Sequence, residues 1–425
     1  MSPSASLHKS SDTRLRVRPA DSRAEREAFL RLPSRLYRND PCWVAPLMFE
    51  RRGTIAAANP VFEHLRWQPF LAWRGDAVVG RISAQVDTLV QTVRGEDIGY
   101  YGLLEAEDDP AVFSALLLTA EQWLRDNGMT AVRGPYNLNI NQECGMLVSG
   151  FDTIPNMMMG HALPYYERHI LDCGYHAAKD LLAYEAPPDF AAPPLLTALQ
   201  KRLAGRLVVS PLDGARKAEE LDAMCEIFND AWANNWGAVP FTQKEFRTVA
   251  SEMLLLIPKQ LIQIARVDGE PAAFIVLLPN LNEALQGLDG KLFPFGWAKL
   301  LWRLKVKFTR SARVPLMGVK QKFQNRIMGP GLAFAVIDAV RHVAARMGVK
   351  TVEMSWVLED NEGMRHIAEG IGGVIVKRYR IYERALVGAG SSLDPTGGAV
   401  PGAAEAVVEE DAEAGADSTA GPAAG

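Results

Sequence analysis

The sequence predicts an α/β (α+β) protein of two tandem domains, each with a mixed central sheet flanked by helices, and three observations support this class. Near the C-terminus, a strand pattern, a glycine-rich loop and a helical pattern follow one another over residues 314–347. A glycine, a buried-strand pattern and an asparagine recur with identical spacing from Gly128 and from Gly348, which indicates an internal repeat. A proline-rich stretch at residues 186–195 is typical of a stiff linker between two such units. Chance similarity of two helix–strand junctions is the alternative explanation of so short a match.

The first half contains the elements of one unit in order. Residues 15–18 have the pattern of an opening strand, and a helical segment runs from Ser22 to about Tyr37. Residues 70–80 predict a hairpin whose strands meet at a Gly-Asp turn. Asp109 then caps a helix with one apolar face, and Gly128 ends that helix.

The second half ends in the best-defined run of elements. Residues 314–319 predict a strand, and the helix after the glycine-rich loop stops at Gly348. Residues 351–358 predict a buried strand, which is followed by Asn361, a short helix and a last strand at about residues 376–383. The expected apolar face of the long helix consists of Leu332, Val336, Val340, Val343 and Met347.

The two copies differ in ways that bear on function. The first copy has an acidic stretch at residues 105–109 where the second has its glycine-rich loop. From the shared asparagine to the next helix-ending glycine, the second copy advances 11 positions and the first advances 33, so the first carries 22 extra positions. This insertion, at residues 142–166, begins at the C-terminal end of a strand, where open α/β sheets place ligand sites. We therefore expect the insertion to serve the function of the protein.

These patterns divide the chain into four parts. Residues 14–185 form an N-terminal domain, residues 186–195 a linker, and residues 196–385 a C-terminal domain. Residues 386–425 contain seven acidic residues and no lysine or arginine, and they are rich in alanine, glycine and proline. This composition predicts a disordered acidic tail. The whole chain has a net charge of −4 and the tail contributes −7, so the rest of the chain carries +3. This mildly basic charge suits a polyanionic ligand.

The composition argues against several classes of protein. The four cysteines show no CxxC spacing, so we expect reduced thiols and neither a disulfide framework nor a metal site. The polar N-terminus lacks the apolar core of a signal peptide, and the longest apolar runs are too short to cross a bilayer. The basic bias is too weak to indicate nucleic-acid binding. We expect the protein in the cytoplasm, where its closest association with a membrane would be peripheral contact with the inner membrane.

The glycine-rich loop has the chemistry of a pyrophosphate site. Gly329 and Gly331 let a ligand approach the backbone, and the start of the following helix offers free N–H groups and the positive end of the helix dipole. The pattern Arg326-x-x-Gly329-x-Gly331, between a strand and a helix, resembles the acyl-CoA loop of the GNAT N-acyltransferases over most of residues 200–385. This resemblance implies that Arg326, Gly329 and Gly331 hold the pyrophosphate and that Asn361 orients the pantetheine arm. A glycine-rich connection that binds nothing is the alternative.

Acyl transfer from a thioester to an amine needs a base for the amine proton and a hydrogen-bond donor for the carbonyl oxygen. Glu143 and His161 of the insertion are candidate bases, and Tyr166 is a candidate proton donor or substrate-binding group. Each has a structural alternative. Glu143 could cap a backbone N–H, His161 could be a structural hydrogen-bonding group, and a tyrosine could anchor the loop in the core.

Other residues bear on the chemistry less directly. The leaving-thiolate acid of the GNAT pattern is often a tyrosine, but Ala368 stands at that position here, counted from Asn361. Tyr379 or Tyr382 could replace it, although a strand tyrosine more often serves packing. Cys144 is a weak nucleophile candidate, because direct attack by the amine makes a covalent step unnecessary.

Residues 291–307 combine bulky aromatic side chains with lysines and an arginine and contain no acidic residue. Such a segment can lie in a membrane interface, with the aromatics at the acyl boundary and the cations on headgroups. A core-packed helix with a solvated basic face is the alternative. Because aromatics and positive charge coincide, we favour contact with a membrane or a lipid substrate.

Several phrases resemble one bacterial group of double-GNAT proteins across residues 14–385, and one branch of that group is the bacterial ceramide synthases. Three of these phrases are residues 38–47, 235–240 and 292–297. The resemblance implies N-acylation of a sphingoid base, such as 3-oxosphinganine, with long-chain acyl-CoA as co-substrate and no permanently bound cofactor. The product would be an oxidised ceramide. Two other functions stay open: acetyl transfer to a small polar amine, and non-catalytic binding of acyl-CoA or lipid.

Overall fold

The computed structural model describes residues 14–254, 257–324 and 328–386. The strands and helices of its first half follow the chain in this order. They are β1 (Leu15–Pro19), α1 (Arg23–Leu36), α2 (Met48–Thr54), β2 (Leu65–Arg74), β3 (Ala77–Asp87), β4 (Ile98–Ala106), α3 (Pro110–Asp126), β5 (Ala131–Gly134), β6 (Tyr136–Asn137), β7 (Glu143–Cys144), β8 (Met146–Ser149), α4 (Tyr166–Asp172) and β9 (His176–Ala186).

The second half repeats this type of order. Its elements are α5 (Pro194–Arg202), β10 (Leu207–Pro211), α6 (Lys217–Trp232), α7 (Gln243–Met253), β11 (Ile262–Val267), β12 (Glu270–Pro279), α8 (Leu281–Leu285), α9 (Gly296–Trp302), β13 (Ser311–Val319), α10 (Met328–Arg346), β14 (Thr351–Leu358), α11 (Glu362–Gly370) and β15 (Val374–Ala385). Short 3-10 or π turns at Pro60–Glu63, Val90–Arg94, Gly214–Arg216, Lys259–Leu261, Arg303–Lys307 and Gln321–Phe323 connect some of them.

Local signals explain the ends of these elements. The side chains of Ser22 and Glu25 form a reciprocal capping box that starts α1. Asp109 accepts a hydrogen bond from Ala111 N at the start of α3, whose predicted apolar face is buried. The predicted hairpin is present, since Arg74 of β2 pairs with Ala77 of β3 across the Gly-Asp turn.

One sheet runs through both halves of the chain. Within the described ranges it has thirteen strands, and all its neighbouring pairs are antiparallel except β4–β5 and β13–β14. Its path is β1-β2-β3-β4-β5-β15-β9-β14-β13-β12-β11-β10, with β8 paired to β15 off this path. The small β6–β7 pair forms a separate sheet.

The two parallel pairs confirm the internal repeat. β4 pairs with β5 and β13 pairs with β14 in equivalent positions, and each second strand follows a long helix that ends in a glycine. These glycines, Gly128 and Gly348, have φ angles of 81° and 89°, a backbone conformation that glycine adopts without steric cost. The repeated spacing therefore encodes the same helix–turn–strand connection twice.

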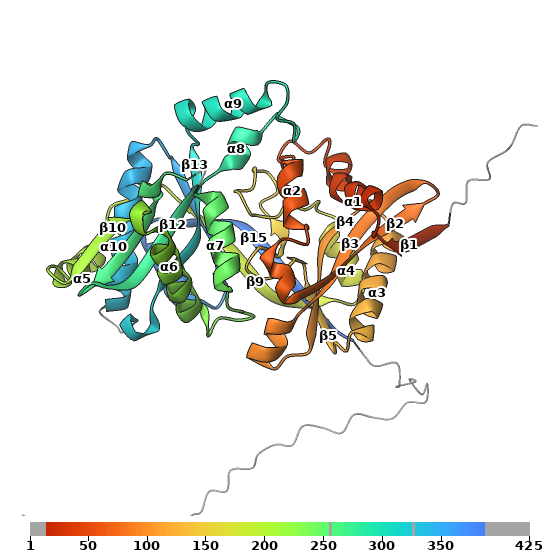
Figure 1. Cartoon of the computed structure of the whole chain (residues 1–425), viewed down its shortest axis with the longest axis horizontal. Helices are drawn as coiled ribbons and strands as arrows, with labels where there is room; N and C mark the ends of the chain where they lie inside the picture. Colours follow the sequence, from red (N-terminus) through yellow and green to blue (C-terminus); the bar gives the residue numbers. More distant parts are fainter. Residues whose placement is uncertain (1–13, 255–256, 325–327, 387–425) are drawn as a thin grey trace, which may run out of the picture. The chain divides into compact units, whose positions relative to one another are not determined.

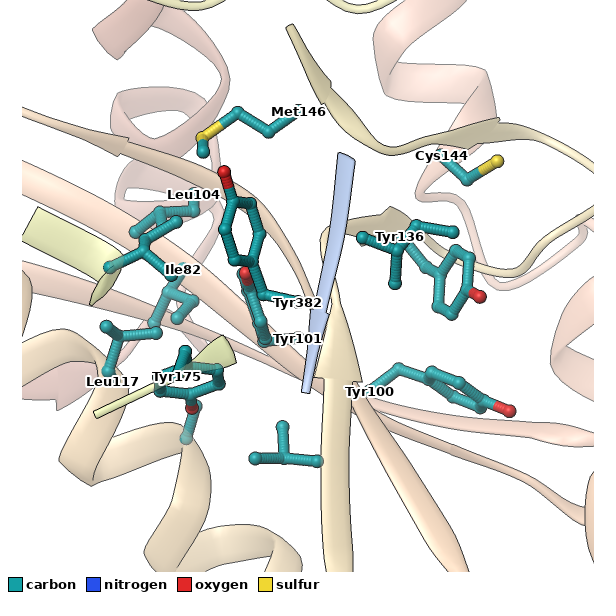
Figure 2. Packing of buried hydrophobic residues seen from close by; sticks show 14 of the residues in the cluster. Ile82, Tyr100, Tyr101, Leu104, Leu117, Tyr136, Cys144, Met146, Tyr175 and Tyr382 are labelled. Atoms are coloured by element: carbon teal, nitrogen blue, oxygen red, sulfur yellow. The ribbon is translucent and has the colours of Figure 1, made fainter. Parts of the chain in front are cut away.

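The last strand of each half pairs with a strand of the other half. β15, from the end of the second half, lies between β5 and β9, and β9, from the end of the first half, lies between β15 and β14 (Figure 1). Tyr382 of β15 is fully buried in the first-half core, and Figure 2 shows it beside Tyr101 of β4. The described residues of both halves consequently belong to one compact unit.

Candidate functional site

The two parallel strands of the second half separate along their length. β13 pairs with β14 from Ser311 opposite Thr351 to Val314 opposite Met354, and their described residues do not pair beyond that point. A cavity of 610 Å³ opens where the strands part. Both strands, α10, the start of α11 and the loop after α6 line this cavity.

The separation leaves backbone N–H and C=O groups of both strands without a partner across the gap. Buried backbone groups need hydrogen-bond partners, so an extended ligand with amide groups of its own can pair with them. The cavity wall is mostly apolar there, with Pro315 and Met317 from β13 and Met354 and Val357 from β14. Its shape and chemistry therefore suit an amide-bearing arm followed by an apolar chain.

Two of the four predicted acyl-CoA residues, Gly329 and Asn361, line this cavity. Gly329 lines it in the first turn of α10, and a Cβ at Gly329 would lie 3.0 Å from the Cα of Gln324. Asn361 also lines the cavity, while its side-chain oxygen accepts a hydrogen bond from Met364 N and caps α11. Gly331 packs against Leu199 of α5 and is not among the cavity residues. Arg326 lies outside the described residues.

A buried polar cluster stands behind the cavity wall. Ser355 of β14 lines the cavity, and its hydroxyl donates to Glu353 Oε1 at 2.6 Å. The Nε of Arg313, a fully buried residue of β13, donates to the same hydroxyl oxygen at 2.8 Å. The Arg313 guanidinium also lies 4.5 Å from the ring centroid of Trp356. We call Arg313, Glu353 and Ser355 the β13–β14 cluster.

The insertion of the first half reaches this cluster. Asn156 Nδ2 donates to Glu353 Oε2 at 2.9 Å, and the backbone oxygen of Met157 accepts from Arg313 Nη1 at 3.1 Å. Asn282 of α8 holds the same loop by donating to the backbone oxygen of Pro155 at 2.8 Å. The insertion thus satisfies the outer hydrogen-bonding groups of a cluster that belongs to the second half.

Glu143 forms an ion pair inside the first half. Its carboxylate lies 2.7 Å from Arg51 Nη2 and accepts from Asn137 Nδ2 at 2.9 Å. Burial acts to raise the pKa of Glu143, but the Arg51 charge and the hydrogen bonds from Arg51 and Asn137 outweigh it, so the pKa is lowered. The residue is therefore ionised at neutral pH, and it is not among the residues that line the cavity.

His161 is paired with an aspartate. Its Nε2 lies 2.8 Å from Asp40 Oδ2, and its buried Nδ1 has no hydrogen-bond partner among the described residues. Burial lowers the pKa of His161 below the usual value, although Asp40 opposes this effect. The imidazole is therefore neutral at neutral pH, and like Glu143 it lies outside the cavity wall.

Tyr166 is buried at the start of α4. Its hydroxyl donates to Glu105 Oε2 at 2.7 Å, and Tyr37 donates to the same oxygen at 2.8 Å. Burial raises the pKa of the Tyr166 phenol, and the Glu105 charge raises it further. These contacts place Tyr166 in a polar cluster of the first-half core, and it does not reach the cavity wall.

The remaining candidates are also buried. Burial raises the pKa of Cys144 to about 12, which keeps its thiol protonated at neutral pH and argues against a nucleophilic role. Tyr379 is fully buried and its hydroxyl has no hydrogen-bond partner among the described residues. Tyr382 donates to Glu167 at 2.9 Å. Ala368 is fully buried and packs with Met354 of β14.

At the parallel pair of the first half, a backbone segment lies close against β4. A Cβ added to Gly102 of β4 would lie 1.7 Å from the backbone oxygen of Tyr136. The rings of Tyr100 and Tyr136 meet edge to face with centroids 4.7 Å apart. Both side chains are labelled in Figure 2. The close backbone contact at Gly102 distinguishes this strand pair from β13 and β14, which border the 610 Å³ cavity.

Sequence reasoning missed the β13–β14 cluster. The sequence predicts a strand at residues 314–319 and a buried strand at residues 351–358, and no site residue in either. A charged residue inside each of two adjacent apolar strands, Arg313 and Glu353, was the available signal, since lone buried charges are rarely tolerated without partners. Their direct pairing in the sheet depends on a register that spacing alone does not give.

The predicted lipid segment is exposed. α9 and the turn Arg303–Lys307 follow α8, and α9 appears at the margin of the view in Figure 1. Phe293 and Phe295 are 81% and 79% exposed, and Trp297, Leu301, Trp302 and Val306 are also exposed. None of the described helices has the length and apolarity needed to cross a bilayer. No cluster of three or more potential metal ligands occurs in the described ranges.

Known proteins resemble the chain over most of its length. It is 47% identical to the bacterial ceramide synthase of Caulobacter vibrioides (strain NA1000 / CB15N) over 380 residues, which are 89% of this chain and 99% of that protein. It is 46% identical to protein YghO of Escherichia coli (strain K12) over 371 residues, which are 87% and 95% of the two chains. No family model matches the chain.

A solved structure supports the fold. A tandem GNAT protein from the clavulanic acid biosynthesis pathway, without AcCoA, superposes with a TM-score of 0.52 at 14% identity, covering 88% of this chain and 99% of that one. This likeness confirms the predicted fold of two tandem GNAT units. Together with the identity to the Caulobacter protein, it shows that the chain belongs to the bacterial ceramide synthase family and has the tandem GNAT fold.

Proposed function

We propose that the protein is an acyl-CoA-dependent N-acyltransferase that acylates a sphingoid base, such as 3-oxosphinganine, to an oxidised ceramide. The observation that carries this proposal is the 610 Å³ cavity between the separated strands β13 and β14, in a chain 47% identical to a bacterial ceramide synthase. The cavity offers an amide-bearing arm the backbone of two strands that do not pair with each other there, and it offers an acyl chain apolar walls. In the reaction, the amine nitrogen bonds to the thioester carbon, the C–S bond breaks, and one proton passes from nitrogen to sulfur.

The co-substrate would enter along α10. Gly329 and the N-terminal end of α10 would receive the pyrophosphate, with Arg326 and Gly331 as the other predicted groups of the loop. Asn361 would orient the pantetheine arm from the rim of the cavity, while it continues to cap α11. The acyl chain would then extend along the apolar walls of the cavity. The proposed co-substrate is long-chain acyl-CoA, and no metal or nucleic acid takes part.

Glu143, His161 and Tyr166 stay predictions as proton-transfer groups. Glu143 is ionised and His161 is neutral, so each has the protonation state of a base. All three lie in the first half, and none lines the cavity. For any of them to act, the amine would have to approach the thioester from the side of the insertion.

A sphingoid base is a membrane lipid, so the proposed enzyme must take its substrate from a bilayer. We propose that residues 291–307 make peripheral contact with the inner membrane through their exposed aromatic side chains. Lys299 in the same segment is exposed, and a lysine there can interact with anionic headgroups. A surface of this kind lets the enzyme take a sphingoid base from the bilayer without a transmembrane helix.

Release of free thiol from palmitoyl-CoA in the presence and absence of 3-oxosphinganine tests the proposal. We expect amine-dependent thiol release, with far slower release from acetyl-CoA. Acetyl-CoA as the preferred donor, with a small polar amine as acceptor, would support the acetyltransferase alternative. Tight binding of palmitoyl-CoA without thiol release would support the non-catalytic alternative, which the alanine at position 368 keeps open.

A further inference from the structure

The β13–β14 cluster brings one hydroxyl of the cavity wall into contact with two charges buried behind it. Glu353 and Ser355 are two residues apart on β14, so their side chains lie on the same face of the strand. Ser355 lines the cavity, whereas Glu353 and Arg313 do not. Ser355 is therefore the residue of the cluster that borders the space proposed for the substrate.

Hydrogen bonds fix the direction of the Ser355 hydroxyl. Its proton goes to Glu353 Oε1 at 2.6 Å, because a carboxylate only accepts, and Arg313 Nε occupies one oxygen lone pair at 2.8 Å. A hydroxyl oxygen has a second lone pair. The sulfur of Met159 also lies 3.5 Å from this oxygen. An amine that reaches the second lone pair would donate an N–H to it, while the O–H remains directed at the carboxylate.

The rest of the cluster keeps Glu353 and Arg313 in place. Asn156 donates to the other oxygen of Glu353, and Arg313 reaches the backbone oxygen of Met157. Lys377 of β15 and Glu185 of β9 are the further charged groups that act on Glu353. A buried ion pair is a weak source of stability, so a structural role alone does not explain a pair of charges in two adjacent strands.

The first half shows that the fold does not require this cluster. In matching register, β4 and β5 pair Tyr100 with Arg133, where β13 and β14 pair Arg313 with Glu353. Two residues further on, the first half has Pro135 where the second has Ser355. The copy without the carboxylate and hydroxyl is also the copy in which the backbone of Tyr136 lies close against β4.

We propose that Ser355 is a catalytic residue that relays the amine proton to Glu353, with Arg313 as the positioning residue. This inference rests on the proposed N-acyl transfer. As the amine nitrogen bonds to the thioester carbon, one N–H proton passes to Ser355 Oγ, and the Ser355 proton passes to Glu353. When the C–S bond breaks, the proton returns through Ser355 to the thiolate, so the amide and free CoA form and Ser355 and Glu353 are restored.

Steady-state kinetics of Ser355→Ala, Ser355→Thr and Glu353→Gln with palmitoyl-CoA and 3-oxosphinganine test the relay. We expect kcat to fall about 10²–10⁴-fold in Ser355→Ala and Glu353→Gln, as for loss of a general base, with the Kd for palmitoyl-CoA changed less than about threefold. Ser355→Thr keeps a hydroxyl and should recover most of kcat, which would show that the hydroxyl is the group required. The unchanged Kd for palmitoyl-CoA separates loss of proton transfer from a distorted cavity.

Matched controls separate this outcome from misfolding and from the other candidate bases. Ser210→Ala removes a hydroxyl from edge strand β10 of the same half and should retain wild-type kcat. Glu143→Gln and His161→Ala, measured in parallel, reveal whether the proton goes to those groups instead. If the wild type is active and kcat in Ser355→Ala and Glu353→Gln is close to that in Ser210→Ala, the relay is overturned. The proposed function is then left intact. A wild-type protein that releases no thiol overturns both.

Discussion

His64 and Glu245 join the two halves of the protein through a buried ion pair. His64 Nε2 lies 3.1 Å from Glu245 Oε1 of α7, and its Nδ1 lies 2.8 Å from Asp87 Oδ1 of β3. All three side chains are almost fully buried. The imidazolium is thus held between one carboxylate from each half.

This arrangement predicts a pH-dependent stability. Burial acts to lower the pKa of His64, but hydrogen bonds and charges of Asp87 and Glu245 raise it to about 10. Because the folded pKa exceeds the ordinary value near 6.5, the stabilisation is complete below about pH 6.5 and is lost as pH rises through about 10. We expect His64→Gln to lower the free energy of unfolding by about 3 kcal/mol at pH 6 and by much less above pH 10. Urea unfolding of wild type and variant across this range checks it, and a difference that does not change with pH would contradict the assignment.

Gly329 should control co-substrate affinity. An aspartate at this position would place a Cβ 3.0 Å from the Cα of Gln324 and a negative charge where the pyrophosphate is proposed. We expect Gly329→Asp to weaken CoA binding at least about tenfold, as a like charge and a clash together require. Isothermal titration with CoA measures this. Gly53→Asp, in exposed α2 of the first half, is the matched control, and equal Kd values for the two variants would refute the loop assignment.

We expect the indole of Trp356 to donate a hydrogen bond to the thioester oxygen. This residue lines the cavity, and its buried indole N–H has no hydrogen-bond partner among the described residues. Trp356→Phe removes this donor but keeps an aromatic ring over Arg313. We expect kcat to fall about 10–100-fold with an unchanged Kd for acyl-CoA, because such a donor acts in the transition state. An unchanged kcat would exclude this role for the indole.

The exposed aromatic segment should bind anionic bilayers. Replacement of Phe293 and Phe295 by serine removes two of the most exposed apolar side chains of the segment. We expect the double variant to co-sediment less than wild type with phosphatidylglycerol-containing vesicles, and the wild-type interaction to weaken with salt. Leu195→Ser, at a 71% exposed position on α5, is the control. Equal sedimentation of the double variant and wild type would show that the segment does not bind membranes.

Sequence patterns predict those helices and strands whose formation depends on a few neighbouring residues. The strand at residues 351–358 and the helix end at Gly348 are where the sequence places them, because strand burial and positive φ are properties of a few neighbouring residues. The repeat was equally accessible, since Gly128 and Gly348 begin the same turn in both copies. The acidic stretch of the first copy predicts that acyl-CoA binds the second copy, and this stays a prediction.

The pairing of strands that lie far apart in the sequence cannot be predicted from such local patterns. Nothing in the pattern of β15 tells that Tyr382 pairs opposite Gly134 of the first half, because strand register between distant segments is decided by the whole core. For the same reason, the sequence does not predict that Arg313 contacts Glu353 and Ser355. It does not predict the hydrogen bond of Asn156 to Glu353 either. Nor does it predict the orientation of Gly331, which faces α5. Of the residues predicted for acyl-CoA, Gly329 and Asn361 line the cavity, and their roles stay predictions.

The central claim is transfer of a long acyl chain to the nitrogen of a sphingoid base. Mass spectrometry of the lipid products after incubation of the purified full-length protein with palmitoyl-CoA and 3-oxosphinganine tests it most directly. The account predicts an N-palmitoylated product that forms in step with free CoA and is absent without protein. Palmitoyl-CoA recovered intact beside unmodified 3-oxosphinganine, with protein that is folded and binds CoA, would contradict it.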